Sequence, residues 1–386
     1  MSGPMPPFSA SDHEEETMKK NPCKPGISGR PLRWGVAMLL SAAVLSAGVA
    51  TPAMAANKVK LSTYDHGKPV SYLPCGAYPL PRRAAVLMGG GLDVKEAFSW
   101  MIDRMAECGS GVTGRPGNLL VIRAGGNPAY DSFIYKLGKL AAVQTVVVPT
   151  VDAANSTELE GYIRNAGAIW FTGGDQGDYY NFWKGTLLER VVSDHVRTYG
   201  IPVGGTSAGM MILSQYAYIA YPLTITSAEA LADPFKPDSV TIKRDFWTYG
   251  TPFDPLSGTV TDSHFDARDR MGRLVTFLAR VIGDGWSPAA TARAIGVDQE
   301  TALLMTSVPG TSGTASVTLR TVANPGVDGA AYLLKADSNS SLVLTPGQPL
   351  TFTRVQVQKL PATGAPSTYE LNVNGGQLSS STGRIY

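Results

Sequence analysis

One serine stands in the run VGGTSAGMMI, residues 203–212, with small residues on both sides of it. Gly205, Ser207 and Gly209 fit the pattern G-x-S-x-G, in which minimal neighbouring side chains let a sharp strand-to-helix turn expose the serine oxygen. The run IPVGGT before it is typical of a strand, and AGMMILSQYA after it can start a helix. We therefore predict that Ser207 is a nucleophile. The alternative is a small residue in an ordinary glycine-rich turn.

A serine nucleophile needs a base, and histidine is scarce here. After residue 55 the sequence has only His66, His195 and His264. The spacing around His195 predicts a partly buried helix residue, and His66 lies in an irregular arm. His264 lies in VTDSHFDARDRMGRL, where polar residues crowd the end of an apolar run and arginines follow. We predict His264 as the base.

A catalytic histidine is commonly oriented by a carboxylate, and two candidates stand out. Glu229 lies between the serine and the histidine, and Asp262 lies two residues before His264. If residues 260–264 are extended, Asp262 points to the same face as His264 and could also shape the pocket. Spacing does not choose between the two. For Glu229 the alternative is a solvated carboxylate on a helix.

Three arginines follow the histidine on a segment predicted as a helix: Arg268, Arg270 and Arg273. We expect this helix to begin near Asp262 or Ser263. Arginine presents a flat fork of donors that suits carboxylates, so the group could hold an acidic substrate. Pairing with Asp266 and Asp269 on a solvated face is the simpler interpretation of these residues taken by themselves.

These residues must be positioned by the surrounding elements, and the chain from Ala84 alternates short apolar runs with amphipathic segments. Such alternation predicts an α/β fold with a doubly wound, mostly parallel sheet, because parallel neighbours need crossovers. No G-x-G-x-x-G opens a helix after the first strand, which argues against a dinucleotide site. The predicted strands are AAVLMGGG, NLLVIRAGG, QTVVVPT, AIWFTGG and IPVGGT, and the predicted helices lie around 92–109, 131–142, 157–166 and 179–199.

Four regions are expected along the chain: a signal peptide at 1–55, an N-terminal arm at 56–80, the α/β core at 81–305, and a β-rich C-terminal extension and tail at 306–386. Arg30 and Arg33 precede the apolar run WGVAMLLSAAVLSAGVA, and Ala53-Met54-Ala55 offers small residues for cleavage after Ala55. We therefore expect the protein to be exported to the periplasm or out of the cell. The alternative is that the apolar run stays attached as a membrane anchor. We expect the tail GGQLSSSTGRIY to be poorly ordered.

The composition of the chain bears on which kinds of partner the protein can bind. The 386 residues are 44% hydrophobic and carry a formal charge of +2, so nothing indicates a nucleic-acid surface or a stable membrane partner. No HExxH pattern occurs, and we expect no metal site. Cys75 and Cys108 could form a disulfide or remain two buried thiols. A homodimer is left open.

Four motifs, in this order, resemble the cyanophycinase group of the dipeptidase E-like serine peptidases: AIWFTGGDQ, IPVGGTSAGMM, TDSHFDARDRMGRL and AIGVDQETALL. The resemblance covers about residues 84–310. It implies a fold related to class I glutamine amidotransferases. It also implies hydrolysis of cyanophycin, a polyaspartate that carries arginine on its side-chain carboxylates, to β-aspartyl-arginine.

The resemblance also assigns roles. Ser207 matches the family nucleophile and His264 the base, while Glu229 lies near the place of the triad acid in a segment that does not match closely. The arginines become part of a substrate pocket instead of a solvated face. Ser263 stands where the family has glutamine, which bears on substrate identity more than on reaction type. The residues that match the pocket are Gln176, Asp262, Arg268, Arg270 and Arg273.

The mechanism expected from these assignments is acyl transfer. His264 takes the proton of Ser207, and the backbone amides of Ala208 and Gly174, from the pair at 173–174, stabilise the oxyanion. No cofactor is required, and the substrate is cyanophycin or another Asp-containing peptide. The alternatives are an aspartyl dipeptidase, a related exported serine peptidase of altered specificity, and a non-catalytic binding protein of the same fold.

Overall fold

A computed structural model describes residues 61–72, 83–106, 117–128, 130–244, 246–248, 250–308 and 315–386. The expected signal peptide lies outside the described residues, as do Cys75 and Cys108. The described residues all fall in one compact unit. Among them, no helix is long and apolar enough to cross a bilayer.

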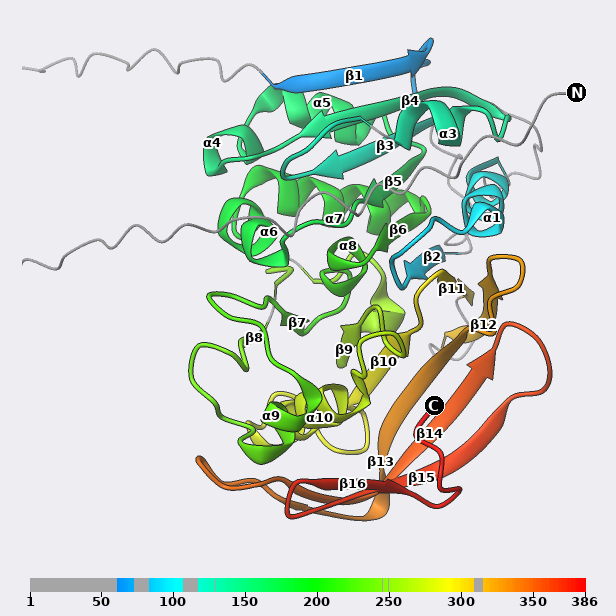
Figure 1. Ribbon diagram of the computed structural model, residues 1–386. Coiled ribbons are helices and arrows are strands. Elements are labelled where there is room, and N and C mark those ends of the chain that lie inside the picture. Colours follow the sequence, from blue (N-terminus) through cyan, green and yellow to red (C-terminus); the bar gives the residue numbers. More distant parts are fainter. Residues whose placement is uncertain are drawn as a thin grey trace, which may run out of the picture. The chain divides into compact units, whose positions relative to one another are not determined.

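The larger sheet has eight strands in the order β1-β4-β3-β5-β6-β2-β11-β12 (Figure 1). Strands β4, β3, β5, β6 and β2 are mutually parallel, and β1, β11 and β12 pair antiparallel at the two sides. The predicted α/β class with a mostly parallel sheet is confirmed. The bounds are β1 Ser62–Gly67, β2 Arg83–Met88, β3 Gly117–Arg123, β4 Leu140–Val147, β5 Ala168–Phe171, β6 Val203–Thr206, β11 Thr301–Val308 and β12 Ser316–Ala323.

Helices cover both faces of this sheet, because successive strand residues point to opposite sides. Leu87 packs into the cluster that includes α4 to α7, while its neighbour Val86 packs into the cluster that includes α1 and α3. The helix expected over 131–142 is shorter, since positive φ at Gly138 and Lys139 ends the helical path before β4. The bounds are α1 Lys95–Ala106, α3 Tyr130–Tyr135, α4 Val151–Ala154, α5 Thr157–Arg164, α6 Gln176–Trp183 and α7 Leu187–Tyr199.

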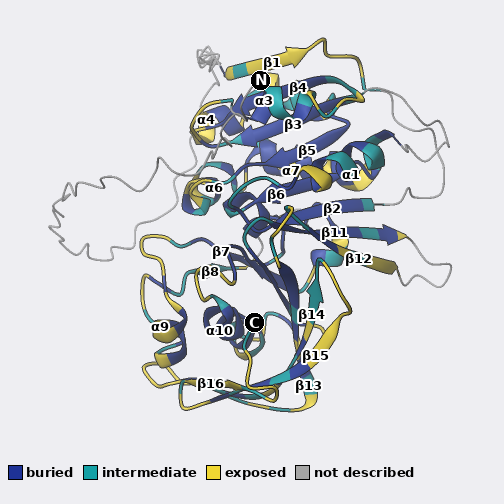
Figure 2. Ribbon diagram, turned by 45° about the vertical axis from the view of Figure 1, so that its right-hand side comes forward, coloured by how far each residue is buried: buried dark blue, intermediate teal, exposed yellow. Residues whose placement is uncertain are grey.

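The second sheet has six strands in the order β16-β15-β14-β13-β10-β9, with β9 and β10 parallel and the others antiparallel. It packs on α10, which Figure 2 shows largely buried, and on α9, which is more exposed. The bounds are α9 Ser227–Ala232, β9 Thr259–Asp262, α10 Met271–Gly283, β10 Arg293–Val297, β13 Ala330–Val343, β14 Thr351–Pro361, β15 Ser367–Asn374 and β16 Gln377–Ser380.

The residues after 305 contribute to both sheets. Strand β12 lengthens the larger sheet, and β13 to β16 build the second sheet together with β9 and β10 from the expected core. The expectation of a poorly ordered tail is wrong, because β16 pairs with β15 over Gln377–Ser380 and the residues after it make side-chain contacts.

Four short elements follow β6 of the larger sheet and precede β9 of the second sheet in the sequence. They are α8 Ala208–Met211, β7 Ala217–Tyr218, β8 Ile242–Lys243 and the 3₁₀ turn Asp254–Leu256. Helix α8 has only one turn, shorter than the helix expected after the serine. The Met211 carbonyl accepts hydrogen bonds from the hydroxyls of Ser214 and Thr261, so these side chains take an acceptor that a continuing helix would use.

Candidate active site

Ser207 stands at a sharp turn between β6 and α8, with φ 51° and ψ −120°. Backbone in this region is costly for a residue with a side chain, and it is the geometry in which a strand-to-helix turn exposes a serine. Gly205 and Gly209 allow the turn, because a Cβ added to Gly205 would collide with the backbone of Gly209. The N–H of Ser207 donates to Met88 O at 3.0 Å, which ties the turn to β2.

His264 comes from the second sheet, two residues after β9. Its Nε2 lies 2.9 Å from Ser207 Oγ, within hydrogen-bonding distance. The backbone N–H of His264 donates to Gly89 O at 2.6 Å, and the ring lies against Gly90, where an added Cβ would collide with it. The structure therefore brings together the predicted nucleophile and the predicted base.

Hydrogen bonds between α8, which follows Ser207, and β9, which precedes His264, fix the positions of these two residues relative to each other. Thr261, inside β9, donates from Oγ1 to Met211 O at 3.3 Å. The Ser214 hydroxyl lies 3.0 Å from Thr261 Oγ1 and also donates to Met211 O. These groups are buried, so the contacts are shielded from competition by water.

The residues from 263 to 270, called the His264 loop from here on, do not form the start of a helix as expected. Helix α10 begins at Met271. Positive φ at His264 (45°) and Asp269 (46°) interrupts the helical path, and Phe265 N–H donates to Val297 O of β10 instead. Arg268 nevertheless lies one turn from His264, since its N–H donates to His264 O at 3.1 Å.

The structure does not bring Glu229 to His264. Glu229 completes a capping box with Thr226 at the start of α9 and pairs with Lys236 at 2.7 Å, with 45% of its side chain exposed. The hydrogen bond from Lys236, followed by those from Thr226, lowers the pKa of Glu229 to about 2. Within the described residues, His264 Nδ1 is buried without a hydrogen-bond partner.

Asp262 and Arg273 form a buried pair instead of facing a substrate. Arg273 donates from Nε to Asp262 Oδ2 at 2.7 Å and from Nη2 to Oδ1 at 2.6 Å. The Asp262 residue is 0% exposed and Arg273 only 2%. The guanidinium also donates to Ile225 O and lies over the ring of Tyr218. The pair joins the end of β9 to the first turn of α10, on either side of the His264 loop, and its expected contact with substrate is not available in this arrangement.

The other two arginines of the expected pocket differ in access. Arg270 is mostly buried and donates from Nη1 to Ser263 O at 2.8 Å, with Asp262 Oδ1 at 3.4 Å. Burial lowers the pKa of Arg270 to about 10, so it keeps its charge at neutral pH. Arg268 is exposed. Of the three arginines, Arg268 is thus the one that can most readily reach a solute.

Burial and then the charges of Arg268 and Arg270 lower the pKa of His264 to about 3, while the Asp262 carboxylate opposes the change. The imidazole is therefore neutral at neutral pH. A neutral imidazole can accept the hydroxyl proton of Ser207, which is what a general base must do.

Of the predicted oxyanion donors, Ala208 directly follows the serine, and Gly174 directly follows Gly173, which lies against Ser207. Ala208 is the first residue of α8, so its N–H has no partner within the helix. Gly173 follows β5 closely, and a Cβ added there would lie 3.4 Å from Ser207 Cβ. Gly174, the next residue, has φ 151°. Two backbone segments thus flank the hydroxyl from the ends of β5 and β6.

Gln176 is half-buried and Ser263 is buried, so the two residues differ in their access to a solute. Gln176 is the first residue of α6, and its Nε2 approaches Met211 Sδ at 3.9 Å, next to the helix that follows the nucleophile. Asp175 caps this helix by accepting Gly177 N–H at 2.7 Å. Ser263 is 1% exposed, so its side chain offers no surface to a substrate.

The two other histidines of the described residues are not at this site. His195 is buried in α7, with Nε2 2.9 Å from Ala166 O, and His66 lies on β1 against Tyr135. Among the described residues, no cluster of three or more His, Cys, Asp or Glu side chains could hold a metal ion.

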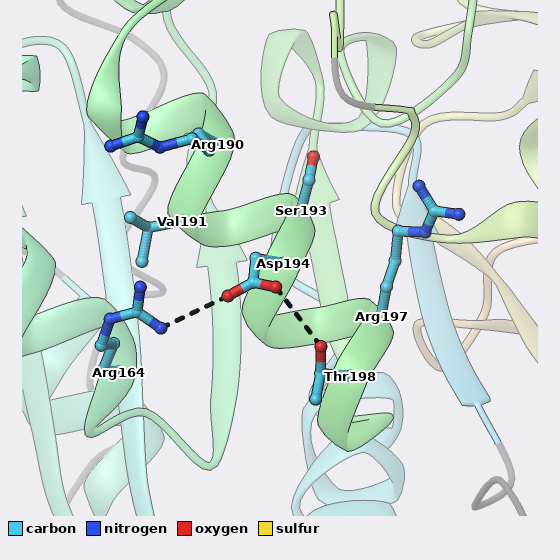
Figure 3. Close-up of a pocket in the computed structure, with 7 residues that line it drawn as sticks. All are labelled: Arg164, Arg190, Val191, Ser193, Asp194, Arg197 and Thr198. Carbon is cyan, nitrogen blue, oxygen red and sulfur yellow. Dashed lines mark hydrogen bonds and ion pairs between the residues drawn. The ribbon is translucent and has the colours of Figure 1, made fainter.

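A surface cavity of about 440 Å³ lies along α5 and α7, away from the catalytic pair (Figure 3). Its arginines do not converge on a common point. Arg164 pairs with Asp194 and Arg197 with Asp254, while Figure 3 shows Arg190 and Arg197 extending to opposite sides. We therefore do not assign a binding site there.

Several contacts that position the His264 loop have no signal in the sequence. Ser227 at the start of α9 donates to Asp269 O, and Asp266 N–H donates to Asp298 Oδ1 at 3.1 Å. Tyr386 contacts the end of the loop. The run GGG at 89–91 is the feature of the sequence that indicates a close approach, because glycines at a strand end leave room for another group. Here that group is the His264 ring.

Comparison with known proteins agrees with this geometry. Residues 86–222 match peptidase family S51, a region that contains Ser207 and ends before His264. This match and the Ser207–His264 pair define the class: the chain is a serine peptidase, a hydrolase. The cyanophycinase group within that class is a narrower identification and remains a proposal.

Two solved structures are similar. A peptidase from an acI-B1 Actinobacterium has 16% identity over 74% of this chain and 96% of its own, with a TM-score of 0.44. A candidate peptidase E protein from Listeria monocytogenes EGD-e has 14% identity over 63% of this chain and 100% of its own, with a TM-score of 0.34. No curated protein matches the sequence.

Proposed function

We propose that this protein is an exported serine exopeptidase that hydrolyses cyanophycin to β-aspartyl-arginine dipeptides. The observation that carries the proposal is the placement of arginine beside the catalytic pair. Arg268 is exposed within one turn of His264, and Arg270 donates to the carbonyl of Ser263, the residue before His264. Guanidinium groups bind carboxylates, and the polyaspartate backbone of cyanophycin ends in a carboxylate.

The proposed reaction passes through an acyl-enzyme. His264 Nε2 accepts the Ser207 proton as Oγ attacks the peptide carbonyl carbon, and the N–H groups of Ala208 and Gly174 donate to the oxyanion. The C–N bond then breaks, and His264 gives its proton to the leaving amine. The leaving amine is the C-terminal β-aspartyl-arginine, and the ester on Ser207 holds the shortened chain. Water then gives a proton to His264 and attacks the ester carbonyl, which releases the shortened chain as a carboxylate and restores the Ser207 hydroxyl.

Within the proposed pocket the roles differ from those that the resemblance implies. Arg268, Arg270 and Gln176 are the groups that we assign to substrate. Asp262 and Arg273 act through their buried pair, which fixes the loop that carries His264.

Incubation of residues 56–386 with insoluble cyanophycin tests the proposal, with mass spectrometry of the material that dissolves. We expect β-aspartyl-arginine from the wild type and none from Ser207→Ala. Arg268→Glu should raise KM at least about 10-fold, the scale of one lost charge-assisted hydrogen bond. Arg190→Glu, an exposed arginine on α7, is the matched control. Undissolved cyanophycin beside a well-cleaved neutral α-peptide would reject this substrate.

An aspartyl dipeptidase is the second candidate, because the buried Ser263 supplies no side chain to a long substrate. Rapid cleavage of short aspartyl peptides with cyanophycin left intact would favour it.

The export proposal rests on the N-terminal residues. Expression of the full chain should give a secreted or periplasmic protein that begins at or near Ala56, which N-terminal sequencing reads directly. An uncut chain in the membrane fraction would contradict it.

A further inference from the structure

Tyr386 reaches back from the second sheet to the end of the His264 loop. Its Oη donates to Asp269 Oδ1 at 2.9 Å and accepts the N–H of Met271 at 2.9 Å. Met271 is the first residue of α10, so its N–H would otherwise have no partner within the helix. One hydroxyl thus joins the last turn of the loop to the start of the helix.

The ring of Tyr386 packs on the same loop. Its centroid lies 5.8 Å from that of Phe265, the residue after His264, and 6.0 Å from that of Tyr332 in β13. Burial raises the pKa of Tyr386, so the phenol keeps its proton and remains a donor.

The His264 loop needs such support, because both His264 and Asp269 hold positive φ. Residues in this region persist only where the surroundings over-determine them. Gly89 O holds the beginning of the loop by accepting the His264 N–H, and Ser227 and Tyr386 hold its end through Asp269.

Tyr386 is itself anchored to the second sheet. Tyr369 of β15 donates from Oη to Ile385 O at 2.7 Å, and Ser380 of β16 donates to Arg384 O at 2.6 Å. The segment that carries Tyr386 is therefore held by two strands before it reaches the loop.

We propose that Tyr386 is a positioning residue for catalysis: through Asp269 and Met271 it holds the His264 loop so that Nε2 stays within reach of Ser207 Oγ. The inference rests on the proposed role of Ser207 as the nucleophile. It adds a function for the β-rich residues after 305, which complete the active site without contacting substrate.

The test uses the rate constant for labelling of Ser207 by a small fluorophosphonate, which requires the Ser207–His264 pair and no particular peptide. Tyr386→Phe removes the hydroxyl and keeps the ring. We expect the rate constant to fall by about 10- to 100-fold, the effect of a small displacement of a catalytic group. The labelled fraction at completion should stay at the wild-type level, since it counts folded molecules. A merely structural role would lower that fraction and leave the rate constant unchanged.

A second pair of variants tests the hydrogen bond itself. Asp269→Asn keeps an acceptor oxygen and should retain most of the rate. Asp269→Ala should lower the rate, but by no more than Tyr386→Phe, because the hydrogen bond from Met271 N–H to Tyr386 Oη remains. The double variant Tyr386→Phe/Asp269→Ala should be no slower than Tyr386→Phe alone, because Tyr386→Phe already removes the contact with Asp269.

Tyr216→Phe is the matched control, since the Tyr216 hydroxyl donates to Trp286 O at 2.9 Å, outside the His264 loop. It should label at the wild-type rate. A wild-type rate in Tyr386→Phe, or an equal loss in Tyr216→Phe, would overturn the inference. A wild type that does not label would overturn both this inference and the serine mechanism, whereas intact cyanophycin with normal labelling would reject the substrate alone.

Discussion

Ser207 Oγ and His264 Nε2 lie 2.9 Å apart although the two residues come from different sheets, and both have positive φ, 51° and 45°. Backbone of this kind costs about 1–3 kcal/mol at each position. The hydrogen bonds to Met88 O and Gly89 O hold both residues on the same strand end, that of β2. The catalytic geometry therefore depends on contacts around the pair as much as on the pair itself.

Removal of either member of the pair should abolish activity. We expect Ser207→Ala and His264→Ala each to lower kcat by about 10⁶-fold, because the two side chains act as a unit. Circular dichroism melting should show nearly unchanged stability. Fluorophosphonate labelling should disappear in Ser207→Ala, and more than a few per cent of wild-type turnover in either variant would contradict the assignment.

Gly90 should tolerate no side chain. In Gly90→Ala the new Cβ would collide with the His264 ring, so the labelling rate of Ser207 should fall at least about 100-fold. Gly138→Ala is the control, because Gly138 also has positive φ but nothing lies within 4 Å of an added Cβ. Both variants should lose about 1–2 kcal/mol of unfolding free energy, and only Gly90→Ala should lose activity.

The two candidate acids should respond in different ways. Glu229→Gln keeps the capping box and breaks only an exposed ion pair with Lys236, so both the unfolding free energy and turnover should stay close to the wild-type values. Asp262→Asn leaves the buried Arg273 charge uncompensated and should cost about 3–5 kcal/mol in urea unfolding. Severe loss of turnover in a stably folded Glu229→Gln protein would show that Glu229 reaches His264 during catalysis.

The labelling rate should depend on pH in an unusual range. Because burial and Arg268 hold the pKa of His264 at about 3, the rate should stay constant from pH 7 to pH 5 and fall only near pH 3. An unperturbed histidine would give half the rate near pH 6.5. Arg268→Gln should move the fall to higher pH, since loss of a positive charge raises the pKa, and Arg190→Gln should not.

The same shift affects stability. The unfolded chain binds a proton at His264 below about pH 6.5, while the folded protein does not until about pH 3. The neutral imidazole therefore contributes stability that is complete above pH 6.5 and is lost as the pH falls through this window. Urea unfolding of wild type and His264→Gln at pH 4.5 and pH 7.5 measures the difference, and equal differences at the two values would contradict the shift.

The sequence by itself determined the features that depend on near neighbours. Alternating apolar and amphipathic runs predict the parallel sheet, and Gly205, Ser207 and Gly209 predict the turn, because backbone conformation there is decided by side chains a few residues apart. The scarcity of histidine narrowed the search for the base, and the polar residues and arginines around His264 predicted it over His66 and His195.

The tertiary structure alone decided which side chains meet and which face solvent. Three features depend on how separate elements pack. Asp262 is paired with the buried Arg273, Glu229 is paired with Lys236 instead of His264, and Tyr386 bonds Asp269 across 117 residues. Hydrophobic periodicity reports which face of an element is buried but not which partner covers it. For that reason, the motif located the reacting pair, and only the packed second sheet showed what holds His264 in place.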